Sequence, residues 1–98
     1  MRFDWDESKN RINRAKHGID FAFARLTFDD PFAITIQGRD VDGKQRYQLI
    51  GAVYSRVILV AHAVATGPGE DQEAIRIISA RRATRLESRT GARSAPPN

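Results

Sequence analysis

The chain has 98 residues, with 16 Lys or Arg against 12 Asp or Glu, and it contains no cysteine. This length allows one domain with a modest core. The absence of cysteine excludes disulfide frameworks and zinc–thiolate sites. No apolar run is long enough for a signal peptide or a membrane span, so the sequence predicts a soluble, cytoplasmic protein with no membrane partner.

The excess positive charge lies in the last quarter of the chain. Residues 1–73 carry 10 basic and 11 acidic side chains, whereas residues 74–98 carry six arginines and a single acid, Glu87. A basic block attracts polyanions, acidic proteins or membrane surfaces, and it is also typical of a solvated helix face. All six cations are arginines, which favours phosphate recognition because a guanidinium binds phosphate through two hydrogen bonds.

Helical signals dominate the first third of the chain. Residues 1–6 alternate as in a short edge strand, and Asp4 or Asp6 can cap a helix over residues 7–17 that stops at Gly18. Asp20 can cap a second helix over residues 21–28. Helical spacing predicts an inner face for the first helix that holds Trp5, Ile12, Ala15 and Ile19. The same spacing predicts an outer face that holds Lys9, Asn13, Lys16 and His17.

From residue 32 the apolar period changes to two, which indicates strands. Four strands are predicted, over residues 32–37, 46–53, 57–65 and 74–79, and the Asp42-Gly43 pair predicts a hairpin between the first two. A short helix over residues 80–88 and a disordered tail over 91–98 follow, so residues 1–90 form the single domain. The predicted class is α+β, with two N-terminal helices on one face of a four-stranded antiparallel sheet and a short C-terminal helix.

The sequence contains no familiar catalytic spacing, neither a Ser/His/Asp arrangement nor HExxH nor a glycine-rich phosphate loop. Strand parity instead places Arg46 and Arg76 on the uncovered face of the sheet, with Arg82 following the last strand. We therefore expect these three arginines to meet at one shallow cationic surface, bordered by Lys16 and His17. His62 is either a satisfied strand histidine or a functional group, because its face depends on the register.

Several motifs occur in a recognisable order: FDWDESKNRINRAKHGIDF, FDDP, GKQRYQLIG and IRIISARRATRLE. Over residues 3–87 they resemble the BrnT family of type II toxins, also called DUF497. The resemblance implies a fold like that of RelE-type ribonuclease toxins, inhibition of translation by action on RNA, and hetero-oligomers with a small BrnA-like antitoxin. The DNA-binding part of that antitoxin would let the complex repress its own operon.

The resemblance also suggests which residues act. Cleavage without a metal or cofactor needs a 2′-hydroxyl to attack the adjacent phosphate, with proton transfer and charge neutralisation from side chains. The candidate catalytic residues are Lys16, His17, Arg46, His62, Arg76 and Arg82. The candidate RNA-binding residues are Lys9, Arg81 and Arg85. Among the catalytic candidates, the three arginines are assigned to binding the phosphate and stabilising the transition state. Lys16, His17 and His62 are the candidates for the general acid and base.

The C-terminus departs from the family pattern. Relatives commonly continue the last helix to a tyrosine, whereas residues 88–98 contain Gly91 and no aromatic residue. An alternative is therefore a catalytically weak or inactive member that binds RNA or an antitoxin in an autorepressing complex. For such a protein, replacing single basic residues is expected to weaken binding in graded steps, and binding is expected to depend steeply on salt concentration. A DNA-binding repressor acting alone is a weaker alternative, because no helix-turn-helix pattern is present.

Overall fold

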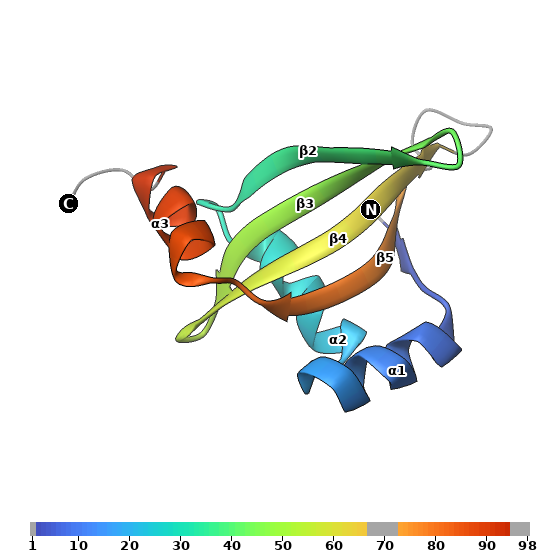
Figure 1. Cartoon of the computed structure of the whole chain (residues 1–98), viewed down its shortest axis with the longest axis horizontal. Helices are drawn as coiled ribbons and strands as arrows, with labels where there is room; N and C mark the ends of the chain where they lie inside the picture. Colours follow the sequence, from blue (N-terminus) through green and yellow to red (C-terminus); the bar gives the residue numbers. More distant parts are fainter. Residues whose placement is uncertain (1, 67–72, 95–98) are drawn as a thin grey trace.

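A computed structural model describes residues 2–66 and 73–94 (Figure 1). The helical elements are α1 (Glu7–His17), α2 (Phe21–Ala24), the 3₁₀ helix η1 (Arg25–Asp29) and α3 (Arg85–Ser94). The strands are β1 (Arg2–Asp4), β2 (Ile34–Val41), β3 (Lys44–Val53), β4 (Arg56–Thr66) and β5 (Glu73–Arg82). They form one sheet in the order β1-β5-β4-β3-β2, which confirms the α+β class.

The sheet differs from the predicted one in strand number and direction. It has five strands in place of four, and it is mixed, because β1 pairs with β5 in parallel. The other neighbours pair antiparallel, as predicted. The predicted hairpin is confirmed as well, since Asp42 and Gly43 between β2 and β3 have φ values of 53° and 76°. Two successive positive φ values are typical of the type I′ turn that suits twisted strands.

Helix α1 has the predicted bounds. Asp6 caps its first turn by accepting a hydrogen bond from the Ser8 backbone N–H at 2.9 Å, and Gly18 ends the helix in the left-handed conformation with φ 71°. The predicted faces were right only in part. Ile19 is buried, and Lys9, Lys16 and His17 are exposed, as predicted, whereas Ile12 is 65% exposed and Asn13 is buried, as is Asn10. An amphipathic pattern alone therefore misassigned part of the inner face.

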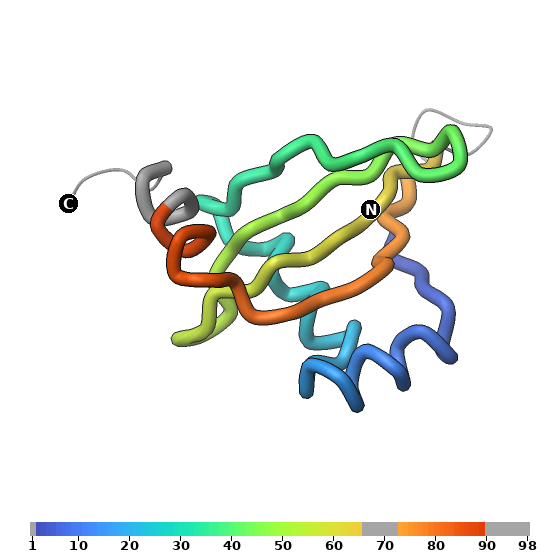
Figure 2. Tube along the Cα trace, in the orientation of Figure 1, coloured from blue at the N-terminus to red at the C-terminus, as the bar shows by residue number. Residues whose placement is uncertain are grey.

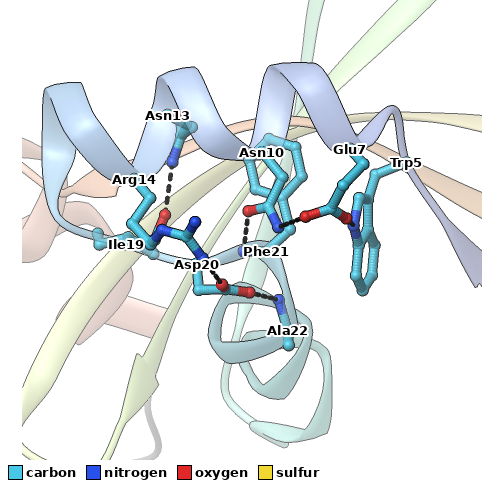
Figure 3. A network of polar contacts seen from close by, with 9 residues as sticks. All are labelled: Trp5, Glu7, Asn10, Asn13, Arg14, Ile19, Asp20, Phe21 and Ala22. Carbon is cyan, nitrogen blue, oxygen red and sulfur yellow. Dashed lines mark hydrogen bonds and ion pairs between the residues drawn. The ribbon is translucent and has the colours of Figure 1, made fainter.

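The buried Asn13 replaces strand pairing that β5 lacks, and the buried Asn10 bonds to the segment after α1. Strand β1 pairs with β5 only as far as Arg76, and α1 packs beside β5 beyond that point (Figure 1). The Asn13 amide accepts a hydrogen bond from the Ala80 N–H at 3.0 Å and donates to the Ala80 carbonyl at 2.8 Å. It also donates to the Ile19 carbonyl at 2.9 Å, while Asn10 accepts from the Phe21 N–H (Figure 3). Buried backbone groups require such partners, and an aliphatic side chain could not supply them.

One face of the sheet, here called the core face, is covered by α2 and η1. Phe21 and Ala24 of α2 are fully buried against it, and Thr27 of η1 lies over β3. Gly51 of β3 permits this close approach, because a Cβ at that position would come within 2.8 Å of Thr27 Cγ2. The cluster of buried apolar residues comprises Ile19, Phe21, Ala24, Leu49, Val53, Ile58, Val60, Ile75, Ile77 and Ala80.

Strand β5 is longer than predicted, and the C-terminal helix starts later. Pairing with β4 continues to Arg82, so the predicted helix over residues 80–88 began too early. Helix α3 instead follows a capping box, in which the Thr84 N–H donates to Glu87 at 2.7 Å and the Glu87 N–H donates to the Thr84 hydroxyl at 3.2 Å. The helix also continues through Gly91 to Ser94, beyond its predicted end at residue 88 and into the predicted tail. Residues 67–72, between β4 and β5, and residues 95–98, half of the predicted tail, lie outside the described residues.

Helix α3 and the β2–β3 hairpin lie at opposite ends of the sheet (Figures 1 and 2). The face opposite the core face, here called the outer face, is buried at the α3 end. Ile50 of β3 and Leu59 of β4 face each other there and are 1% and 3% exposed, although they do not belong to the main cluster. At the hairpin end this face is hollowed, and the candidate site lies there.

Candidate functional site

A cationic groove of about 510 Å³ occupies the hairpin end of the outer face. Its lining residues are Lys9, Lys44, Gln45, Arg46, Tyr47, Ala63, Val64, Ala65, Arg76 and Ile78. Within the described part of the chain, four lining residues carry a positive charge and none carries a negative one. The small side chains of Ala63 and Ala65, in the middle strand β4, leave the space between the flanking basic residues open. A concave surface with this charge attracts anions.

Two predicted arginines meet in this groove. Arg76 pairs with Ala63 across β4 and β5, and Arg46 shares its face of β3 with Gln48, the neighbour of Ala61. Arg46 and Arg76 therefore flank Ala63 from the two sides, about 10 Å apart at the backbone, since adjacent strands are ~4.8 Å apart. Two long guanidinium side chains can reach one phosphate from that separation. The expected convergence of Arg46 and Arg76 is thus found.

The two remaining cations of the groove come from helix α1 and from the hairpin end of β3. Lys9 projects from α1, and Lys44 begins β3 at the hairpin. Lys44 was missed from the sequence, although it stands two residues before Arg46 and therefore shares its face. Asp4 of β1 makes a salt bridge to Arg76 at 2.9 Å, between side chains that are each about half exposed. This contact orients the guanidinium while it remains open to solvent.

A second hollow of about 200 Å³, here called the edge hollow, lies between α1 and β5. It is lined by Lys9, Ile12, Asn13, Lys16, His17, Ile78 and Ser79. Lys9 and Ile78 line both the groove and the edge hollow, so the two are neighbours. Lys16 and His17 therefore border the cationic surface as expected, but from the separate hollow.

His62 lies on the core face, away from these cations. Its ring is 4% exposed, stacks on Tyr47 with centroids 5.8 Å apart, and meets the edge of Phe28 at 5.0 Å. Its Nδ1 lies 3.2 Å from the Val60 carbonyl, and burial lowers the pKa of the imidazole. The structure thus favours the satisfied strand histidine, and it separates His62 from the groove.

Arg82 does not join Arg46 and Arg76, which corrects the expected three-way convergence. A bulge shifts the register between β4 and β5: Ala61 pairs with Ser79, whereas the next residue, His62, pairs with Ile77. The extra residue, Ile78, reverses the parity of β5 beyond it. Arg82 consequently pairs with Ile58 and shares the side of Ala80, the core face.

Arg81 and Arg85 lie at the α3 end, away from the groove. The Arg81 guanidinium donates two hydrogen bonds to the Glu87 carboxylate, at 2.8 and 2.9 Å. Hydrogen bonding to Arg81, with further bonds from Thr84, lowers the pKa of Glu87 to about 2, and the same pair raises the pKa of Arg81. The ion pair between Arg81 and Glu87 therefore links β5 to α3. Arg85 is exposed on the first turn of α3.

The family is decided by sequence comparison. A family model described as the ribonuclease toxin BrnT of type II toxin–antitoxin systems matches residues 5–87. The chain belongs to the BrnT family. A search of the curated proteins found no match. BrnT membership implies an antitoxin as partner and, for the family, ribonuclease activity.

The BrnT-like motifs divide between structure and site. Asp6, Gly18 and Asp30 are structural: the first two delimit α1, and Asp30 accepts a hydrogen bond from the Ala52 N–H at 2.7 Å. Arg46 and Arg76 instead face the groove. Among the described residues no group of three His, Asp or Glu side chains could hold a metal ion. Nor does any helix in that part of the chain have the length and apolarity to cross a membrane.

Proposed function

We propose that this BrnT protein is a metal-independent endoribonuclease that inhibits translation by cleaving RNA, with the scissile phosphate in the cationic groove. The observation that carries the proposal is the placement of Arg46 and Arg76 on one face, in one groove that Lys9 and Lys44 complete. Four cations around an open floor suit a polyanion better than a neutral ligand.

Arg46 and Arg76 act on the phosphate in this proposal. Attack of the 2′-hydroxyl oxygen on the adjacent phosphorus, with loss of the hydroxyl proton, forms a phosphorane with additional negative charge on its oxygens. The bond from phosphorus to the 5′-oxygen then breaks, the 5′-oxygen takes up a proton, and a 2′,3′-cyclic phosphate remains. Each guanidinium remains positively charged and can donate two parallel hydrogen bonds to those oxygens. Because β3 and β5 hold both residues in a sheet, little reorganisation is required as the charge develops.

Lys9 is our candidate for proton transfer, because it is the lysine of α1 that lines the same groove as both arginines. Lys16 and His17 line the edge hollow, about two helical turns further along α1. Because they line that hollow and not the groove, we assign them a role other than chemistry on the bound phosphate. His62 is left out because it is buried on the opposite face.

Independence from metal is supported by the charge of the groove, since four cations repel a divalent ion. Cleavage by the purified protein is expected to continue in excess chelator. If chelator abolished cleavage and magnesium restored it, the metal-independent mechanism would be wrong, although the groove could still bind RNA.

The decisive experiment compares three arginine variants on a labelled single-stranded RNA. Arg46→Gln and Arg76→Gln are expected to lose about 10²-fold or more in kcat, the usual cost of removing a transition-state donor. Arg82→Gln is the matched control, because it removes the same charge from the same strand on the opposite face. Circular dichroism and thermal melts establish that each variant is folded. Equal losses in Arg76→Gln and Arg82→Gln would refute the assignment of the groove.

A second candidate function is binding without cleavage, as part of a complex with an antitoxin. The salt bridge between Asp4 and Arg76 favours it, because it already occupies one of the two phosphate ligands. Induced expression with and without the neighbouring small gene separates the two candidates. Growth arrest that the small gene relieves supports the toxin, whereas absence of arrest, with RNA binding retained, supports the binding module.

A further inference from the structure

The edge hollow continues the cationic groove along α1. Lys9 and Ile78 contribute to both linings, and Lys16 and His17 add basic side chains beyond them. Among the residues that the structure describes, no acidic side chain lines either one. The positive surface therefore extends from Lys44 at the hairpin, past Arg46 and Arg76, to the end of α1.

From this continuity we propose that the edge hollow is a second phosphate subsite, which takes a flanking phosphate of an extended single RNA strand whose scissile phosphate lies in the groove. The inference rests on the proposed function, because it requires RNA in the groove. It adds the substrate class, a polynucleotide strand that spans both depressions.

The separation of the cations requires a ligand with more than one phosphate. Lys9 and Lys16 are seven residues apart on α1, which corresponds to about 10 Å along the helix axis. Lys16 lines the edge hollow and not the groove, whereas Arg46 and Arg76 line the groove and not the edge hollow, so a phosphate held between the two arginines does not lie beside Lys16. A mononucleotide would therefore leave the edge hollow empty, whereas a strand of several nucleotides would fill it.

The subsite is rigidly attached to the sheet. Asn13, which lies between Lys9 and Lys16 in the sequence, is 5% exposed and holds both backbone polar groups of Ala80. Helix α1 therefore cannot slide along β5 without breaking these hydrogen bonds. Cations mounted on a fixed helix bind phosphate with a smaller loss of conformational freedom than cations on a loop.

The proposal also accounts for the exposure of Ile12. This side chain is 65% exposed and lines the edge hollow together with Ile78. An apolar wall beside basic side chains suits a nucleotide, because the sugar and the base edge present apolar surface next to the phosphate. The class of ligand is thus a nucleic-acid strand, in preference to an inorganic anion.

The experiment measures the salt dependence of binding to a single-stranded 2′-O-methyl oligonucleotide, which lacks the attacking hydroxyl. Each phosphate neutralised on a single strand contributes about −0.7 to the slope of log K against log salt. Lys16→Gln is expected to reduce the steepness of the slope by about 0.7. The matched control is Arg14→Gln, on the same helix, whose guanidinium pairs with Asp20 at 2.9 Å and lines neither depression. It is expected to leave the slope unchanged.

Four outcomes separate this inference from the proposed function. A shallower slope in Lys16→Gln alone supports the subsite. If wild-type protein binds and cleaves RNA but both variants keep the wild-type slope, the subsite is refuted and the proposed function stands. Loss of kcat in Lys16→Gln with an unchanged slope also refutes it, because Lys16 would then act in the chemistry. If wild-type protein neither binds nor cleaves RNA, the proposed function itself fails.

Discussion

Replacing Glu87 by Gln tests how α3 is held on the sheet. Gln can still accept the hydrogen bond from the Thr84 N–H, because Glu and Gln are interchangeable in a capping box. It cannot form the charged, two-bond contact with Arg81. The substitution therefore isolates the ion pair from the cap, which replacement by Ala would not do.

The expected magnitude follows from the pKa of Glu87. Lowering that pKa from 4.5 to about 2 corresponds to roughly 3 kcal/mol of linked stability as an upper bound. The side chains of Arg81 and Glu87 are 36% and 26% exposed, so solvent screening reduces this value. We expect Glu87→Gln to lower the free energy of unfolding at pH 7 by about 1–2 kcal/mol, or ~4–8 °C in Tm for each kcal/mol.

The pH dependence has a definite sign. A carboxyl group whose pKa is lower in the folded state contributes its full stabilisation above pH 4.5, and that contribution disappears as pH falls through about 2. Urea unfolding of wild type and Glu87→Gln, repeated from pH 7 to pH 2, measures it directly. The difference should shrink below pH 4.5. A difference that is absent at pH 7, or independent of pH across this range, would refute the role of the pair.

Two further predictions concern the buried polar residues. Asn13→Ala should lower the free energy of unfolding by about 3 kcal/mol, because it leaves the Ala80 N–H and carbonyl unpaired. The control is Ile12→Ala, at the exposed neighbouring residue, which should change the free energy of unfolding by less than ~0.5 kcal/mol. If urea unfolding gave equal losses of stability for the two variants, the role of Asn13 in pairing with the edge of β5 would be wrong. His62→Gln should keep RNA cleavage. Because burial lowers the pKa of His62 in the folded protein, the unfolded chain binds a proton at this residue first as pH falls below 6.5, and the wild-type protein loses stability. His62→Gln should remove this part of the loss of stability. If the folded His62→Gln protein did not cleave RNA, His62 would have to be counted among the catalytic residues.

Much of the fold could be predicted because its signals are local. The change of period at residue 32 and the Asp42-Gly43 turn indicated the hairpin, and Asp6 with Gly18 bounded α1. Strand β1 was visible only as a possible edge strand, because three residues carry little periodic signal and its parallel partner lies 72 residues away. Local rules identify elements better than they identify distant pairing.

Two errors came from rules that tertiary structure overrides. Residues 80–82 have good helix propensity, yet pairing with β4 keeps them in the strand, and the Thr84–Glu87 capping box was the missed signal for the true helix start. On α1, Asn13 is buried and Ile12 is exposed, which reverses the usual pattern. The reason is the unpaired edge of β5, whose N–H and carbonyl groups need a polar side chain. No periodicity argument contains that requirement.

The candidate site was predicted in part, and the bulge at Ile78 explains where the prediction stopped. In a regular strand, Arg76 and Arg82 would share a face because six residues separate them. One inserted residue reverses every later side chain. On β4 their partners, Ala63 and Ile58, are five residues apart and hence on opposite faces. The same insertion turns Arg81 to the outer face, where Glu87 binds it, so a single backbone irregularity divides the arginines of β5 between the groove, the core face and the attachment of α3.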